Sequence, residues 1–280
     1  MTERTTSDPA DLTYGSYLRL PELLSCQSPA TDEHDEMLFV IIHQVYELWF
    51  KQILHEAAFL QTRLEAGSGT GALHTARRIA KILKTIVGQL DVLETMTPRQ
   101  FAAFRPRLGS SSGFQSDQFR ELEAVLGRRD LDASLDPRTA VALKRRSVFD
   151  SLLRYLLAEG FDVPQPAIER DPSTAFPSGD PSILQVLTDV YDDDARAAGE
   201  VCEALVDIDE GIQEWRYRHV KMVERIIGAR IGTGGSAGAQ YLRSTLFRPA
   251  FPDLWAVRGE PPHKIATHET LHDSAGDPGA

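Results

Sequence analysis

The chain has 280 residues, two cysteines and a formal net charge of −11, with 42% hydrophobic and 25% charged residues. This balance is typical of a globular protein and excludes collagen-like, wholly disordered and disulfide-scaffold classes. The acidic charge argues against nucleic acid or anionic membrane as the main partner, because both require clustered cations. The N-terminus lacks an apolar signal segment and no window reaches about 18 uninterrupted apolar residues, so we expect a cytoplasmic location.

Helical periodicity dominates the chain between two polar ends, residues 1–11 and 261–280, which we expect to be flexible. The first long helix is predicted over about residues 32–65. Acidic residues crowd its first turn, at the positive end of the helix dipole, and its middle is apolar on nearly all sides. Further helices are predicted over about residues 72–95, 116–126 and 137–159, and five prolines in residues 160–181 predict a crossing loop.

A short helix is predicted to begin at Thr97 and to end near Gly109. Thr97 is a suitable N-cap, Pro98 takes the first helical position, and Gln100 follows three residues after the cap. Phe101 and Arg105 stand one turn apart on this helix. Arg105 could form a surface ion pair, or its guanidinium could bind a carboxylate.

The last predicted helix covers residues 183–227. Apolar residues recur along it at spacings of three and four, and His219 occupies a position on this seam between Trp215 and Met222. A seam of this kind is typical of a helix that packs lengthwise against others. Because no internal repeat and no linker separates two cores, we predict one all-α domain over residues 12–260, built as a bundle of long helices.

Two histidines lie on apolar helix faces and have two possible interpretations each. His43 follows Phe39 by one turn and precedes Glu47 by one turn. Each histidine could be a core residue with satisfied hydrogen bonds. Alternatively, His43 is a hydrogen-bond partner or metal ligand in a dry site, and His219 is a neutral imidazole bound to a metal or haem iron, as in helical bundles.

Two further motif matches are weak because their surroundings are wrong. Residues 232–237 match the loose dinucleotide fingerprint but follow a helix, where that site requires a strand. This glycine-rich loop could still fold over a ligand and offer backbone N–H groups and the Thr233 hydroxyl. Residues 268–272, HETLH, match the zinc-protease pattern but lie in a polar tail with no room for a third ligand downstream.

Five ordered stretches together resemble the tryptophan 2,3-dioxygenase family, from Leu12 to about Arg258. They are residues 12–25, 34–56, 93–116, 215–228 and 232–238. The resemblance implies an all-helical homotetramer that binds one non-covalent haem b, with ferrous iron, between the helices of each subunit. It also implies that both atoms of O2 are inserted across the indole C2–C3 bond of L-tryptophan. The implied product is N-formyl-L-kynurenine, at the first step of the kynurenine pathway.

The resemblance also implies a role for individual residues. His219 matches the axial ligand of the haem iron, and His43 matches the catalytic distal histidine that meets the indole N–H. Arg105 matches the arginine that binds the substrate carboxylate, and Thr233 matches the residue that holds the amino-acid end and closes the site. The other implied substrate contacts are Phe39, Val40, Ile41, Ile42, Phe101, Ser112, Tyr14 and Tyr17.

Tyr14 and Tyr17 match a segment that, in the family, reaches into the site of a neighbouring subunit. Phe101 stands where some members carry Tyr, so a phenolic hydroxyl is absent at that contact. Two alternatives remain from sequence: a sister haem oxygenase acting on a modified indole or another aromatic amino acid, and a non-enzymatic helical haem-binding protein. The pair Arg105 and Thr233 favours a free amino acid as the substrate.

Overall fold

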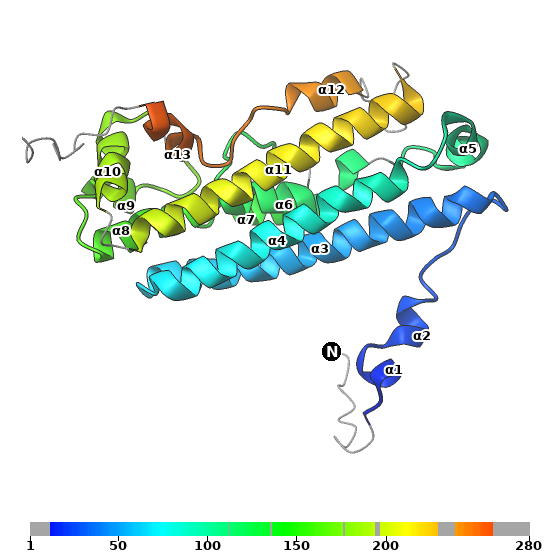
Figure 1. The fold of residues 1–280 in the computed structure, drawn as a ribbon, viewed down its shortest axis with the longest axis horizontal. Helices are drawn as coiled ribbons and strands as arrows, with labels where there is room; N and C mark the ends of the chain where they lie inside the picture. The colour runs from blue at the N-terminus through cyan, green and yellow to red at the C-terminus, as the bar shows by residue number, and fades with distance from the viewer. Residues whose placement is uncertain are drawn as a thin grey trace, which may run out of the picture. The chain divides into compact units, whose positions relative to one another are not determined.

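The computed structural model describes residues 12–111, 113–134, 136–175, 177–193, 197–228 and 239–259. Every regular element in these ranges is a helix, which confirms the predicted all-α class (Figure 1). Three helices are much longer than the others: α3 (His34–Glu65), α4 (Gly69–Leu93) and α11 (Ala198–Ile227). The first two match the helices predicted over about 32–65 and 72–95. Both polar ends that we expected to be flexible lie outside the described residues.

The remaining helices are short. They are α1 (Tyr14–Tyr17), α2 (Leu20–Leu23), α5 (Pro98–Phe104), α6 (Asp117–Leu126), α7 (Pro137–Leu143), α8 (Val148–Ala158), α9 (Gln165–Glu169), α10 (Pro181–Asp192), α12 (Ala239–Ser244) and α13 (Pro252–Ala256), with 3-10 helices η2 (Arg105–Arg107), η3 (Gly113–Gln115) and η4 (Val257–Gly259). Among the helices of the described ranges, none has both the length and the apolar character needed to cross a bilayer.

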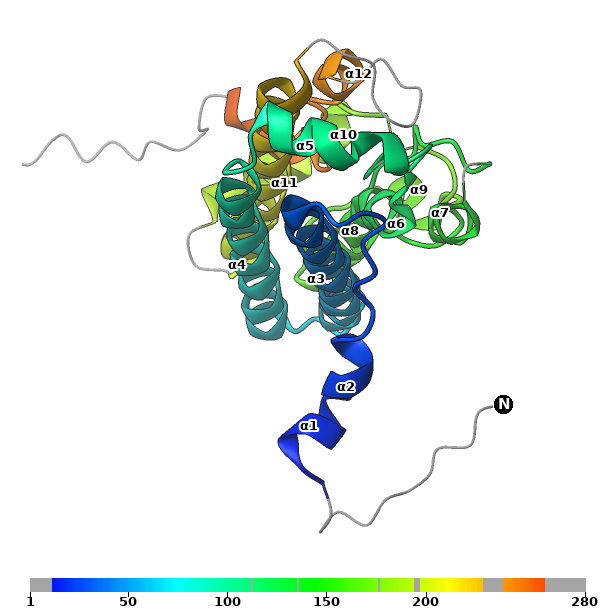
Figure 2. The same ribbon diagram turned by 90° about the vertical axis from the view of Figure 1, so that its right-hand side faces the viewer.

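The chain divides into two compact units by the contacts among its residues. Unit 1 comprises Met1–Leu54, Lys81–Arg120 and Gly211–Phe247, and unit 2 comprises His55–Ala80, Glu121–Glu210 and Arg248–Ala280. Each of α3, α4 and α11 contributes residues to both units. Figure 2 shows these three helices close to end-on. The single domain over residues 12–260 stays a prediction.

Within unit 1, α11 packs closely against α4. A Cβ atom placed on Gly211 would lie 3.0 Å from the Cβ atom of Leu83, so glycine permits this approach of the two helices. Two ion pairs join the same helices further along. Lys84 Nζ lies 2.9 Å from Glu214, and Arg218 Nη2 lies 2.6 Å from Asp91. These contacts fix the part of α11 that carries the candidate iron ligand.

The short helix α5 begins where the sequence predicts it. The Thr97 hydroxyl accepts from the backbone N–H of Gln100, and the Gln100 side chain accepts from the N–H of Thr97, which is a capping box. The α-helix ends at Phe104, earlier than the predicted end near Gly109. Arg105 then begins the 3-10 turn η2. The prediction of the start was therefore correct, and the helical stretch ends near the predicted Gly109, with its last turn 3-10 and not α.

Two predicted helices are each divided into two in the structure. The stretch over 137–159 forms α7 and α8, because the Ser147 hydroxyl caps a new helix by accepting from the N–H of Asp150 at 3.2 Å. The stretch over 183–227 forms α10 and α11, since Asp193 has φ −103° and ψ 83°, outside the helical region. The predicted crossing loop over 160–181 also contains one short helix, α9.

A buried carboxylate organises the end of unit 2. Asp209 of α11 accepts hydrogen bonds from the backbone N–H groups of Ala250 and Phe251, each at 3.0 Å, and from Trp255 Nε1 at 2.9 Å. Three donors thus satisfy the oxygens of this buried side chain within the protein. The interaction holds α13 and the residues before it to α11.

Candidate functional site

Both candidate histidines belong to one aromatic cluster in unit 1. The His43 ring lies 6.2 Å from Tyr46, Tyr46 lies 6.3 Å from Trp215, and Trp215 lies 5.1 Å from His219. These distances join ring centroids. We call His43, His219 and the rings between them the two-histidine site. The fold thus brings together residues of α3 and α11 that are far apart in the sequence.

His219 lacks the hydrogen bond that a satisfied core histidine would have, as far as the described residues show. Its ring is parallel to Trp215, with an interplanar angle of 3°, and no described residue forms a hydrogen bond with it. Burial lowers the pKa of His219 to about 4, and the neighbouring His43 contributes in the same direction. At neutral pH the imidazole is therefore uncharged and keeps a lone pair that can bind a metal ion.

His43 is held in a defined orientation by its own helix. Its Nδ1 lies 2.7 Å from the carbonyl oxygen of Phe39. Because a carbonyl only accepts, Nδ1 carries the proton and Nε2 keeps the lone pair. Burial lowers the pKa of His43, against the opposing effects of the Phe39 carbonyl and of Glu47. The result is a neutral imidazole whose Nε2 accepts no hydrogen bond from the described residues.

Three phenylalanines extend the cluster beside His43. The Phe39 ring lies 4.1 Å from the His43 ring, 5.8 Å from Phe101 and 5.5 Å from Phe104. Phe101 and Phe104 come from α5, so the capping box at Thr97 sets where they meet α3. The predicted substrate contacts Phe39 and Phe101 therefore lie together, next to the predicted distal histidine.

Arg105 lies directly after α5 and is half-buried. Its backbone N–H donates to the carbonyl of Phe101, which fixes its position one turn after that ring. Its role at the substrate carboxylate stays a prediction.

The other predicted contacts on α3 point in different directions around the helix. Ile42 is buried in the core, Val40 is half-buried, and Ile41 is 41% exposed. A helix turns by about 100° per residue, so these three cannot all share the face of Phe39 and His43. Their role in substrate binding stays a prediction.

The N-terminal tyrosines are open to solvent in the single chain. Tyr14 is 77% exposed and Tyr17 is 73% exposed, and neither side chain forms a hydrogen bond or a ring contact with another described residue. Ser112 and Thr233, with the loop over 232–238, lie outside the described residues.

Sequence reasoning did not assign a role to two polar side chains of the cluster. The Tyr46 hydroxyl and the Trp215 indole N–H are buried, and neither has a hydrogen-bond partner in the described part of the chain. An unsatisfied buried donor is costly, so a bound group that supplies acceptors would stabilise both. The position of Trp215 one turn before His219 was the signal that could have identified it.

These residues fit an iron porphyrin. No group of three or more His, Cys, Asp or Glu side chains within the described ranges could hold a metal ion. A porphyrin supplies its own equatorial nitrogens, so that one neutral imidazole such as His219 is enough from the protein. The fold and the site therefore give a helical protein with two neutral imidazoles in one aromatic cluster, where one imidazole would be enough to hold an iron porphyrin.

Comparison with known proteins identifies the family. The model of the family described as tryptophan 2,3-dioxygenase matches residues 2–159 and 182–260. A protein of Anaeromyxobacter sp. (strain K) with that name is 61% identical over 259 residues, covering 89% of this chain and 96% of the relative. Proteins of the same name from Herpetosiphon aurantiacus and Caulobacter vibrioides are 52% and 43% identical, with 89% of this chain and 98% of each relative covered. The chain belongs to the tryptophan 2,3-dioxygenase family.

The pKa of His219 leads to a measurable expectation for the haem-free protein. The imidazole should stay neutral down to about pH 4, as followed by NMR of labelled histidine. The unfolded chain takes up this proton near pH 6.5. Because the unfolded state is protonated first, the free energy of unfolding should fall by up to about 3 kcal/mol as pH drops from 6.5 to 4. His219→Gln should lack this part of the pH dependence, and a His219 pKa near 6.5 would contradict the expectation.

Proposed function

We propose that this protein is a haem-dependent dioxygenase that converts L-tryptophan and O2 into N-formyl-L-kynurenine. The carrying observation is the pair of neutral imidazoles in one aromatic cluster: His219 without a hydrogen-bond partner among the described residues, and His43 with Nε2 available. Membership of the family and the names of the relatives support the same reaction. A cytoplasmic location is part of the proposal.

His219 is proposed to hold one haem b per subunit as the axial ligand. Its neutral form at physiological pH is the form that binds iron, so no proton has to be displaced on binding. The parallel Trp215 ring restricts the orientation of the imidazole. When bound, the haem iron supplies the activation of O2, and the protein supplies position and electrostatics.

His43 is proposed to position the indole. With Nδ1–H donated to Phe39, Nε2 is a hydrogen-bond acceptor for the indole N–H of the substrate. Phe39, and Phe101 beside it, supply apolar ring surface for the indole. These residues also keep water away from the reacting C2–C3 bond, since their side chains offer it no hydrogen bonds.

Arg105 is proposed to bind the substrate carboxylate from the turn after Phe101. Thr233 is proposed to hold the amino-acid end of the substrate, and Ser112 to contribute a hydroxyl near the haem. Together these polar groups would select a free amino acid and leave the indole on the aromatic side. Val40, Ile41 and Ile42 are proposed as further contacts of the α3 segment.

The functional assembly is proposed to be a homotetramer in which the N-terminal segment enters a neighbouring site. Support comes from the exposed apolar residues at this end of the chain, including Tyr14, Tyr17 and Leu24, the last 71% exposed. Large apolar side chains that stay exposed together mark interaction surfaces. Cys26 and Gln27, which follow this segment, are attached to α3. The side chain of Gln44 forms a hydrogen bond with Gln27 at 2.6 Å and another with the Cys26 carbonyl at 3.0 Å.

Deleting residues 1–20 is expected to lower both assembly and tryptophan turnover, because Tyr14 and Tyr17 are removed with the segment. Analytical ultracentrifugation and steady-state kinetics measure the two effects. Tyr14→Ser with Tyr17→Ser in the full chain is the milder companion variant. A deletion protein that is a fully active monomer would show that the segment does not act across subunits.

The direct test of the activity uses the ferrous protein, air-saturated buffer and L-tryptophan. N-formylkynurenine is expected to accumulate and to be detected by its near-ultraviolet absorbance. When 18O2 is used, mass spectrometry should show that both labelled oxygen atoms are in the product. A protein that binds haem and O2 without oxidising L-tryptophan would contradict the proposal. Oxidation of another indole in preference to tryptophan would contradict the substrate assignment alone.

A further inference from the structure

Unit 2 contains a cavity that the proposed reaction does not use. It has a volume of about 440 Å³ and opens to solvent. Three arginines, two acids and three apolar residues account for most of its wall: Arg146, Arg154, Arg170, Asp150, Glu169, Ala167, Ile168 and Pro172. Such a wall, with several cations beside apolar surface, is typical of a binding site for a small anion.

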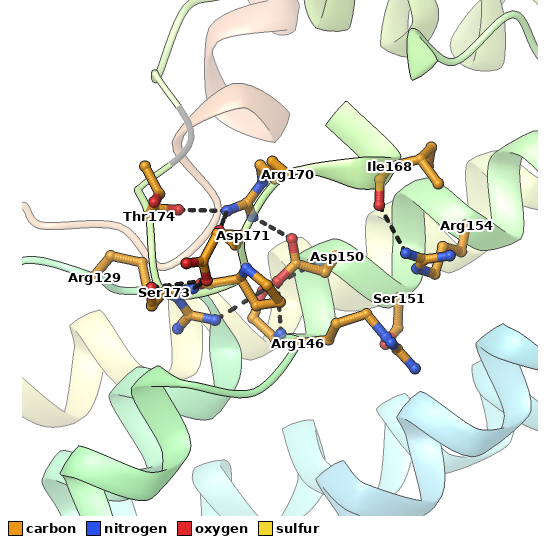
Figure 3. A network of polar contacts seen from close by, with 12 residues as sticks. Arg129, Arg146, Asp150, Ser151, Arg154, Ile168, Arg170, Asp171, Ser173 and Thr174 are labelled. Carbon is orange, nitrogen blue, oxygen red and sulfur yellow. Dashed lines mark hydrogen bonds and ion pairs between the residues drawn. The ribbon is translucent and has the colours of Figure 1, made fainter. Parts of the chain in front are cut away.

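The first wall of the cavity is one face of α8 together with Arg146, two residues before this helix. Arg146, Asp150 and Arg154 follow one another at intervals of four, so they share that face. The second wall comes from α9 and the residues after it. Arg154 Nη2 donates to the Ile168 carbonyl at 2.7 Å and joins the two walls (Figure 3).

Asp150 is already neutralised by its surroundings. It accepts from the backbone N–H and the hydroxyl of Ser147, at 2.7 and 2.8 Å, and pairs with Arg170. Arg129 adds a second guanidinium at 3.6 Å, and Figure 3 shows Asp150 between the two arginines. Because this carboxylate is buried and doubly paired, it opposes an incoming anion only weakly.

Arg146 and Arg154 differ in their partners. Arg146 donates through Nε and Nη2 to the two carboxylate oxygens of Glu65, each at 3.0 Å. Arg154 is half-buried, and its one hydrogen bond within the described residues goes to a neutral carbonyl, with no acid in ion-pair range. The hydrogen bond with Arg146 lowers the pKa of Glu65 most, and the charge of Arg154 also lowers it, from beyond that range.

We propose that this cavity binds a small organic monocarboxylate. The carboxylate accepts from the N–H groups of Arg154 that the Ile168 carbonyl does not use, in a charge-assisted and bidentate arrangement. The apolar part of the ligand lies against Ala167, Ile168 and Pro172. Glu169 on the same wall repels a second negative charge, which favours a monoanion over phosphate.

Benzoate is a suitable probe, since it combines one carboxylate with a flat apolar ring. Isothermal titration calorimetry of the full-length, haem-containing protein should show binding with Kd in the region of about 1 mM. Hydrogen–deuterium exchange should slow in peptides covering residues 165–175. This local readout separates the cavity from binding at Arg105, which would leave those peptides unchanged.

Arg154→Gln is the informative variant because its amide can still donate to the Ile168 carbonyl. It should weaken benzoate binding about tenfold and remove the protection of residues 165–175. Arg77→Gln removes the same charge from an exposed position, 65% exposed at the side chain, and should leave both unchanged. Arg154→Lys, which keeps the charge but not the paired geometry, should retain part of the binding.

Three results would overturn the proposal. The first is that benzoate gives no protection of residues 165–175 in the parent protein. The second is that neutral benzyl alcohol protects these residues as strongly as benzoate, since recognition would then not depend on charge. The third is that inorganic phosphate protects them and benzoate does not, which would assign the cavity to a different anion.

Discussion

His219→Ala is expected to fold, to lose most of its haem on purification and to lose all measurable tryptophan turnover. A methyl group cannot coordinate iron, and no other histidine lies in α11. Removing a residue that merely supports a metal ligand costs roughly 10- to 100-fold in metal affinity, and removing the ligand itself should exceed that. The ratio of Soret to protein absorbance measures the loss. Full haem occupancy with an unchanged iron spectrum would contradict the assignment.

His43→Ala is the matched control, because it removes the second imidazole of the same cluster. His43 is proposed to act as a hydrogen-bond acceptor, so this variant should keep its haem and turn over tryptophan more slowly. Added imidazole should restore haem binding to His219→Ala, since it can enter the space left by the ring. Loss of haem from His43→Ala alone would mean that the two histidines have exchanged roles.

Arg105→Leu is expected to lower kcat/KM for L-tryptophan by about 10- to 100-fold. A charge-assisted hydrogen bond contributes roughly 1.5–3 kcal/mol, and each 1.4 kcal/mol corresponds to a factor of about ten. The carboxylate lies away from the reacting C2–C3 bond, so the loss should fall mainly on KM. Tryptamine, which has no carboxylate, should be a poor substrate of the parent and change much less in the variant.

The informative quantity is the ratio of kcat/KM for L-tryptophan to that for tryptamine. Arg107→Leu is the control, because Arg107 lies in the same 3-10 turn and is exposed. It should leave the ratio near that of the parent. An equal loss for both substrates in Arg105→Leu, with haem still bound, would show that Arg105 supports the structure and that the carboxylate binds elsewhere.

Local signals in the sequence were enough to predict most helices and several of their ends. The capping box at Thr97 was visible because a cap depends on residues three positions apart. The capping box at Ser147 was equally local, and it lies at the end of a polar run over residues 144–147 that interrupts the apolar pattern, but this signal was not used to divide the predicted helix. The break after Asp192 has no glycine or proline to mark it, which is why one helix was predicted there.

The sequence by itself determined that His43 and His219 lie on apolar helix faces, and the family resemblance assigned their roles. The sequence could not show whether the imidazole nitrogens of these histidines have hydrogen-bond partners, because such partners can come from other segments of the chain. Only the tertiary structure placed Tyr46 of α3 against Trp215 of α11 and left the His219 ring without a hydrogen-bond partner among the described residues. It also placed Arg154 on a cavity wall with a hydrogen bond to the Ile168 carbonyl and no ion pair within the described residues. The phase of a helix is set by neighbours in sequence, whereas the faces that meet are set by packing between distant segments.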